Sequence, residues 1–168
     1  MNTGRESLAA ELGRRLLARG IRVAIAESCT GGLVAAAITS VAGSSAWFER
    51  GFVTYSNDAK YEMLGVPRAL IEAQGAVSEA VARAMAEGAR AHSGAACAVS
   101  VTGVAGPGGG TPAKPVGMAC LGWVAPGGPP VVATRHFPGG RAKVRAAAVD
   151  AALAGLIDLL DARAGPAK

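Results

Sequence analysis

Aromatic residues are scarce in this sequence, making up 4% of its 168 residues. A core must therefore be aliphatic, and the 51% hydrophobic content supplies enough such material for one domain. Proteins that stack nucleic-acid bases place aromatic side chains among basic ones, and that pattern is absent. The net charge is +5, with the basic residues scattered rather than grouped. We therefore expect no nucleic-acid partner; the positive balance suits a small anionic ligand, or solubility alone.

Cysteine and histidine are also few. Cys29, Cys97 and Cys120 are widely spaced, odd in number and without a CxxC pair, so neither a disulfide framework nor a zinc site is expected. The two histidines, His92 and His136, have no neighbouring carboxylate at metal-ligand spacing. The sequence thus predicts no metal, no cofactor and no histidine-based triad. An arrangement of serine, lysine and tyrosine is the best remaining chemistry.

Long apolar runs are missing as well. None is long enough to cross a membrane, and the N-terminal residues lack the basic region and apolar block of a signal peptide. We therefore expect a cytoplasmic protein with no membrane partner.

Hydrophobic periodicity alternates between helix and strand along the whole chain. Helices are predicted at residues 8–19, 33–40, 59–64, after Pro67, 80–91 and 141–160, and strands at 22–26, within 43–55, 95–101, 116–124 and 131–137. Mixed order with apolar strands predicts an α/β fold, a sheet covered by helices on both faces. Residues 1–168 should form a single domain with a core at about 5–162, and the tail 163–168 should fray.

The stretch 42–60 places reactive side chains at both ends of one predicted strand. Ser44 and Ser45 lie in a turn before it, Tyr55 lies at its end, and Lys60 lies one turn inside the next helix. Serine is a poor nucleophile until a base takes its proton, and a desolvated lysine can be that base. A returning strand or helix can bring such ends together.

The segment 27–32 joins a predicted strand to a predicted helix. Ser28 and Thr30 can cap that helix, and Gly31 and Gly32 allow backbone N–H groups to face a phosphate or carboxylate. An ordinary helix cap is the commoner meaning of such residues. Cys29 beside a helix start could also be an activated thiolate, although no histidine lies nearby in the sequence.

Two further segments could bind an anion. The glycine-rich loop at 102–111 follows a strand and could present successive N–H groups to an oxyanion or phosphate. It is neither a Walker loop nor a convincing dinucleotide fingerprint, and a mobile surface loop is the alternative. Arg141 and Arg145 share one face of the last helix. They could grip a phosphate, or form a solvated basic face.

Taken together, several segments resemble one known family, the CinA C-terminal domain family. The motifs that carry the resemblance are Ala-Glu-Ser-Cys-Thr-Gly-Gly (26–32), Ala-Gly-Ser-Ser (42–45), Val-Thr-Tyr-Ser-Asn-Asp-Ala-Lys (53–60), Gly-Ala-Val-Ser (75–78), Thr-Gly-Val-Ala-Gly-Pro-Gly-Gly (102–109), Lys-Pro-Val-Gly (114–117) and Phe-Pro-Gly-Gly-Arg (137–141). They cover roughly residues 5 to 162. Gly140 and Met118 depart from the family pattern, where Asp and Thr are frequent, and Gly140 directly precedes Arg141.

The resemblance implies a three-layer α/β/α fold and a homodimer or higher homo-oligomer. It also implies hydrolysis of nicotinamide mononucleotide to nicotinate mononucleotide and ammonia, as part of NAD recycling. Many relatives carry an additional N-terminal domain resembling a molybdopterin-binding fold. This chain has no room for that domain, so we expect its activity to be absent.

By resemblance and by chemistry, Ser45 is the predicted nucleophile, Lys60 its base and Tyr55 a proton relay or orienter. N–H groups around Ser45 or in the 102–106 loop would hold the oxyanion, and Glu27 would face the pyridinium charge of the substrate. The remaining predicted substrate-binding residues are Ser28, Thr30, Gly31, Gly32, Asn57, Thr102, Gly103, Ala105, Gly106, Arg141 and Arg145. The alternative is a nucleotide-binding regulatory module without turnover, linked to competence or DNA damage.

Overall fold

Five strands form one mixed sheet in the order β2-β1-β3-β4-β5. The strands are β1 (Val23–Glu27), β2 (Phe48–Val53), β3 (Cys97–Gly103), β4 (Met118–Val124) and β5 (Val131–His136). β1 is parallel to both β2 and β3, whereas β4 is antiparallel to β3 and β5. Glu27 pairs with Val53 and Val101, so β1, β2 and β3 end together. We call this edge the carboxyl edge of the sheet.

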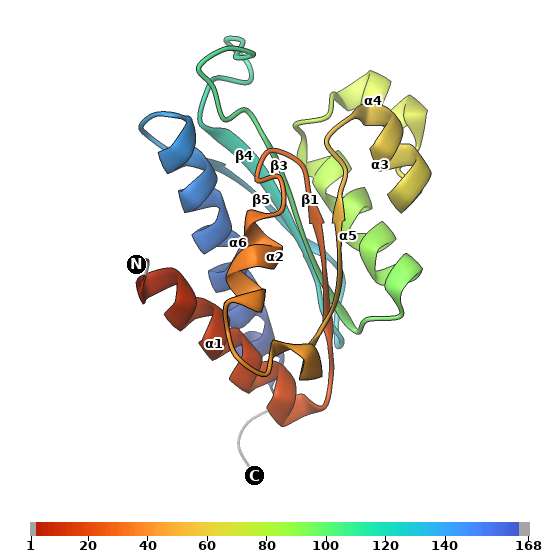
Figure 1. Ribbon diagram of the computed structural model, residues 1–168. Coiled ribbons are helices and arrows are strands. Elements are labelled where there is room, and N and C mark those ends of the chain that lie inside the picture. The colour runs from red at the N-terminus through yellow and green to blue at the C-terminus, as the bar shows by residue number, and fades with distance from the viewer. Residues whose placement is uncertain (1–2, 165–168) are drawn as a thin grey trace.

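Helices cover both faces of the sheet (Figure 1), which confirms the predicted three-layer α/β/α fold. One layer holds α1 (Thr3–Arg19), α2 (Leu33–Thr39) and α6 (Arg141–Arg163), and the other holds α3 (Asn57–Leu64), α4 (Arg68–Gln74) and α5 (Glu79–Ser93). A 3-10 turn, η1 (Ser44–Ala46), precedes β2. The structure, a computed structural model, describes residues 3–164. Most of the tail predicted to fray, residues 165–168, lies outside the described residues.

The strands carry apolar side chains on both faces, as expected for a covered sheet. In β1, Val23 and Ile25 pack with α1 and α6, while Ala24 and Ala26 pack with α5. The alternation follows from the two-residue period of a strand. Within the described residues the buried hydrophobic side chains are aliphatic or sulfur-containing apart from two tryptophans, Trp47 and Trp123.

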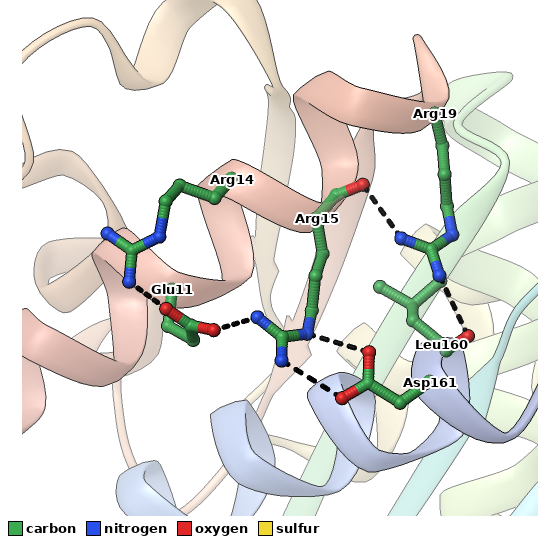
Figure 2. A network of polar contacts seen from close by, with 6 residues as sticks. All are labelled: Glu11, Arg14, Arg15, Arg19, Leu160 and Asp161. Atoms are coloured by element: carbon green, nitrogen blue, oxygen red, sulfur yellow. Dashed lines mark hydrogen bonds and ion pairs between the residues drawn. The ribbon is translucent and has the colours of Figure 1, made fainter. Parts of the chain in front are cut away.

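A polar network joins α1 to the last turns of α6 (Figure 2). Arg15 donates to both carboxylate oxygens of Asp161, at 2.8 and 3.0 Å, and also pairs with Glu11. The hydrogen bond from Arg15 lowers the pKa of the Asp161 carboxyl. Arg19 donates to the carbonyl of Leu160 at 2.9 Å. Exposed ion pairs contribute little stability, so the buried side chains between the two helices dominate this contact.

The helix α3 starts two residues before the predicted start at residue 59. Ser56 is its N-cap, and the Ser56 Oγ accepts from the N–H of Ala59 at 3.0 Å. Ser56 has the extended backbone that an N-cap needs. Because Ser56, Asn57 and Asp58 are all residue types that cap helices, the sequence does not single out the cap. Pro67 is the N-cap of α4.

Gly88 gives a test of the close approach between α5 and α3. A Cβ at this position would lie 2.1 Å from the carbonyl oxygen of Leu64, a backbone atom that cannot rotate away. We expect Gly88→Ala to destabilise the fold by about 1–3 kcal/mol, lowering Tm by roughly 2–4 °C per kcal/mol in calorimetry. Gly4→Ala is the matched control, because nothing lies within 4 Å of its Cβ position. An unchanged Tm for Gly88→Ala would contradict the packing described.

Candidate active site

A pocket of about 290 Å³ opens at the carboxyl edge of the sheet. Its walls come from the ends of β1 and β3, the start of α3, the segment before α5, and the first turn of α6. The lining residues are Ser28, Cys29, Tyr55, Asn57, Lys60, Ala76, Val77, Thr102, Gly103, Val104, Ala105, Gly106, Gly108, Gly109 and Arg141. Ligands of open α/β sheets bind at this edge, outside the carboxyl ends of the strands.

Lys60 and Ser28 form a hydrogen-bonded pair inside this pocket. The Lys60 Nζ lies 3.1 Å from the Ser28 Oγ and 2.8 Å from the carbonyl oxygen of Thr54. Both side chains are buried, with Lys60 1% exposed and Ser28 8% exposed. The main-chain N–H of Ser28 donates to Val101 at 2.9 Å, so the serine extends the β1–β3 pairing by one residue. The nucleophile-and-base geometry of a serine–lysine dyad is therefore present.

Burial lowers the pKa of Lys60 below its usual value near 10.5. Removing an ammonium from water disfavours its charged form. Among residues 3–164 no carboxylate forms an ion pair with Lys60 that would oppose this effect. Its neighbours are a hydroxyl and carbonyl oxygens, which leaves the amine suited to accept a proton.

Cys29 also lines the pocket, but its thiol is poorly suited to attack. Burial raises the pKa of Cys29 to about 11. A thiol with such a pKa is protonated at neutral pH, and the thiolate is the nucleophilic form. The activated-cysteine alternative is therefore disfavoured by the structure.

The structure does not bring Ser45 to Lys60. Ser45 lies in η1, before the first residue of β2, and is exposed, whereas Lys60 follows the last residue of that strand. The two therefore lie toward opposite ends of β2, since η1 precedes this strand and α3 follows it. A strand of six residues is about 17–20 Å long. The parallel neighbour β1 instead delivers Ser28 to the carboxyl edge, because parallel strands end on the same side.

Tyr55 lines the pocket, but its hydroxyl faces a different partner from the one expected. Tyr55 is exposed, and Arg141 Nη2 donates to the Tyr55 hydroxyl at 3.2 Å. Arg141 Nη1 also donates to the carbonyl of Gly106 at 2.9 Å. The geometry places Tyr55 as a support for Arg141 rather than between Ser28 and Lys60.

Glu27 is fully engaged by the backbone and does not line the pocket. Its carboxylate accepts from the N–H groups of Val34 and Ala35, at 2.9 and 3.1 Å, and the residue is 1% exposed. A carboxylate at a helix N-terminus satisfies N–H groups that lack helical partners and interacts favourably with the helix dipole. Its position indicates that it anchors α2, not that it pairs with a substrate charge.

Arg145 likewise binds the protein rather than the pocket. It donates to the carbonyls of Cys29 and Thr30, at 3.0 and 3.2 Å. Gly31 and Gly32 adopt positive φ in the same turn, and a Cβ on Gly31 would lie 3.3 Å from the Arg145 guanidinium. Thr30 is fully buried. These residues hold the turn that follows Ser28 and do not line the pocket.

The other predicted binding residues do line the pocket, namely Ser28, Asn57, Thr102, Gly103, Ala105, Gly106 and Arg141. Sequence reasoning left out Ala76 and Val77, although the Gly-Ala-Val-Ser motif contains them. It also gave Ser28 only a binding role. The signal for a larger role was its position directly after a buried strand, where a parallel sheet exposes side chains at its carboxyl edge.

No helix in residues 3–164 is both long enough and apolar enough to span a membrane. Within the same residues, no group of three or more His, Cys, Asp or Glu side chains is arranged to hold a metal ion.

Comparison with known proteins identifies many relatives. A nicotinamide-nucleotide amidohydrolase PncC from Pseudomonas putida is 54% identical over 153 residues, covering 91% of this chain and 95% of the relative. A CinA-like protein from Anaeromyxobacter dehalogenans is 55% identical over 150 residues but is matched over only 36% of its length. This chain thus spans about a third of that longer relative and nearly all of the shorter one.

Solved structures agree with the sequence matches. The competence/damage inducible protein CihA from Agrobacterium tumefaciens has a TM-score of 0.89 and 48% identity, covering 92% of this chain and 94% of that one. A CinA superfamily protein from Escherichia coli has a TM-score of 0.89 and 38% identity, covering 92% and 90%. Residues 5–160 match the family described as the CinA C-terminal domain. The chain therefore belongs to the CinA C-terminal domain family.

Proposed function

We propose that this chain is a nicotinamide-nucleotide amidohydrolase that converts nicotinamide mononucleotide and water to nicotinate mononucleotide and ammonia. The observation that carries the proposal is the buried Lys60–Ser28 pair, 3.1 Å apart in the pocket. The name of the Pseudomonas putida relative, which is matched over 95% of its length, supplies the substrate. Self-association and a cytoplasmic location remain predictions.

In the proposed first step, neutral Lys60 takes the proton of the Ser28 hydroxyl as Oγ attacks the carboxamide carbon. The tetrahedral intermediate collapses as the Lys60 ammonium returns a proton to the departing nitrogen. Ammonia leaves, and an ester joins Ser28 to the nicotinoyl group. Lys60 then takes a proton from water, which attacks the ester, and the serine recovers its proton as nicotinate mononucleotide departs.

The glycine loop would stabilise the intermediate's oxyanion. Ala105 and Gly106 line the pocket, and their N–H groups have no backbone acceptor among the described hydrogen bonds of residues 3–164. The N–H of Val104, by contrast, already donates to Met118 at 2.8 Å. Free N–H groups directed at a developing negative charge accelerate acyl transfer.

The phosphate of the substrate would bind beside Arg141, at the first turn of α6. The guanidinium lines the pocket, and within the described residues its contacts are with Gly106 and Tyr55, not with a carboxylate. A helix start and an arginine both favour an anion. The pyridinium of the substrate, lying near Lys60, would further favour the neutral amine.

The direct test uses purified protein with nicotinamide mononucleotide and follows ammonia and nicotinate mononucleotide together. We expect the two products in equal amounts. Tight substrate binding without ammonia would favour the regulatory nucleotide-binding alternative over an enzyme.

Chelation tests whether the reaction needs a metal ion. We expect dialysis against a strong chelator to leave kcat and KM unchanged, because the proposed base, nucleophile and oxyanion donors are all protein groups. The described residues also offer no cluster of metal ligands. Activity that disappears on dialysis and returns with a divalent cation would overturn this mechanism.

A further inference from the structure

One wall of the pocket is the segment Gln74–Val77, between α4 and α5. We call it the 74–77 wall. Its residues Ala76 and Val77 line the pocket together with residues of the glycine loop. Gly75 has a φ of 78°, so the chain turns sharply as it leaves α4. The 74–77 wall belongs to no strand, so its carbonyl groups depend on side chains for hydrogen-bond donors.

Three successive carbonyls of this wall each accept a side-chain hydrogen bond. Lys114 Nζ donates to Gln74 O at 2.5 Å, and Ser78 Oγ donates to Gly75 O at 3.0 Å. Thr102 Oγ1 donates to Ala76 O at 2.9 Å. Ser78 directly follows the wall in the chain and is the N-cap of α5. Thr102 and Lys114 instead lie at the two ends of the glycine loop. The loop and the wall are thus joined at two points.

Lys114 is itself held in place by the far half of the glycine loop. The Thr111 N–H donates to Lys114 O at 2.9 Å, and the Lys114 N–H donates to Thr111 Oγ1 at 3.0 Å. Val116 packs against the loop's near half, where a Cβ on Gly106 would lie 2.4 Å from it. The Gly117 N–H donates to Val104 O at 2.8 Å. The glycine loop and the segment 114–117 that follows it therefore pack together as one hairpin.

The surroundings of the Lys114 ammonium favour a cation. Gln74 O is at the carboxyl end of α4, where carbonyls lack helical partners and the helix dipole is negative. A Cβ on Gly75 would lie 2.5 Å from Nζ, so the absence of a side chain there leaves room for the ammonium. Lys114 makes no contact with Ser28 or Lys60 among the described hydrogen bonds of residues 3–164.

We propose that Lys114 is a positioning residue that fixes the separation between the glycine loop and the 74–77 wall, and so sets the affinity for the substrate. This inference rests on the proposed function. When the pocket walls are already fixed, no conformational entropy is lost in ordering them on binding, so the affinity for the ligand is higher. Lys114 would thus act on substrate binding, whereas Ser28 and Lys60 carry the chemistry.

The test compares Lys114→Met with Lys114→Arg and with Arg90→Met. Arg90 is an exposed cation near the end of α5 and outside the pocket lining, so Arg90→Met removes the same charge away from the phosphate site and controls for long-range attraction of an anionic substrate. Steady-state kinetics with nicotinamide mononucleotide would give kcat and KM. Hydrogen–deuterium exchange of the peptides covering residues 74–78 and 103–117 would report wall mobility without depending on turnover.

For Lys114→Met we expect KM to rise about tenfold with kcat within about threefold of the wild type. This pattern indicates the loss of binding energy that the substrate and the transition state share equally. Exchange should accelerate in both peptides. Lys114→Arg should restore most of both properties, and Arg90→Met should behave as the wild type. The proposal is overturned by unchanged exchange, by an unchanged KM, or by a fall in kcat alone. If the wild type releases no ammonia, the proposed function fails, and the exchange comparison alone decides the role of Lys114.

Discussion

Ser28→Ala is expected to lower kcat for ammonia release by at least about a thousandfold, because it removes the atom proposed to bond to the carboxamide carbon. Ser28 Oγ lies 3.1 Å from the Lys60 amine at the floor of the pocket. Without it, water would have to attack directly, with only the oxyanion donors and the bound geometry assisting. Measurement of ammonia release at saturating substrate checks this expectation.

Ser45→Ala is the matched control, since it makes the same chemical change at an exposed position outside the pocket. Its kcat should stay within about twofold of the wild type, as surface substitutions have small effects. Both variants should keep the wild-type circular dichroism spectrum. A dead Ser45→Ala alongside an active Ser28→Ala would restore the assignment that the sequence suggested and reject the present one.

Lys60→Arg should lower kcat by about a hundredfold to ten-thousandfold, the range that general-base catalysis contributes. Arginine keeps a positive charge but does not lose its proton near neutral pH, because its pKa exceeds ~12. Lys60→Met, which removes the amine at similar length, should be equally impaired. If Lys60 only attracted the phosphate as a positive charge, Lys60→Arg would keep kcat and raise KM instead.

The pH dependence follows from the direction of the Lys60 pKa shift. Burial lowers this pKa, and the base acts in its neutral form, so kcat/KM should rise with pH through the lowered pKa and then level off. The stability contribution has the same sign. Below the lowered pKa the buried ammonium is destabilising, and stability rises with pH toward the unfolded pKa near 10.5. A rate that falls as pH rises through this range would contradict the role of Lys60 as a base.

The fold could be predicted from the sequence because its periodic signals are local. Within the predicted helix 141–160, Val149, Leu153, Leu156 and Leu160 recur at helical spacing, and all four side chains are buried in α6. Gly20 directly follows α1, and Ser78 is the N-cap of α5. The predicted elements are all present, with boundaries displaced by a few residues. At the start of α3 the displacement occurs where Ser56, Asn57 and Asp58 could each serve as the cap.

The site was less predictable, because it depends on which strand ends meet. Lys60 and Ser28 are 32 residues apart in the chain and come together only through the parallel pairing of β1 with β2. Ser45 is closer to Lys60 in sequence, but β2 separates them. Predicting the parallel order of the strands would have directed attention to the residue after β1 rather than to the turn before β2.

Side chains that position other groups were hardest to recognise. Glu27 and Arg145 have charges typical of a binding site, yet Glu27 is occupied by N–H groups in the first turn of α2 and Arg145 by carbonyls of the turn between β1 and α2. The sequence gives no indication that Lys114 positions the 74–77 wall, because its partner is a main-chain carbonyl 40 residues away. Carbonyl acceptors carry no side-chain signature, so such contacts cannot be read from residue types.

Ser28 is proposed to form the covalent intermediate, and mass spectrometry of the quenched reaction tests this role most directly. Enzyme mixed with excess nicotinamide mononucleotide would be stopped in acid within the first turnover, digested and mapped. We expect a nicotinoyl-nucleotide ester on the peptide that contains Ser28, absent from Ser28→Ala and retained in Ser45→Ala. An ester on the peptide that contains Ser45, or a thioester on Cys29, would contradict it.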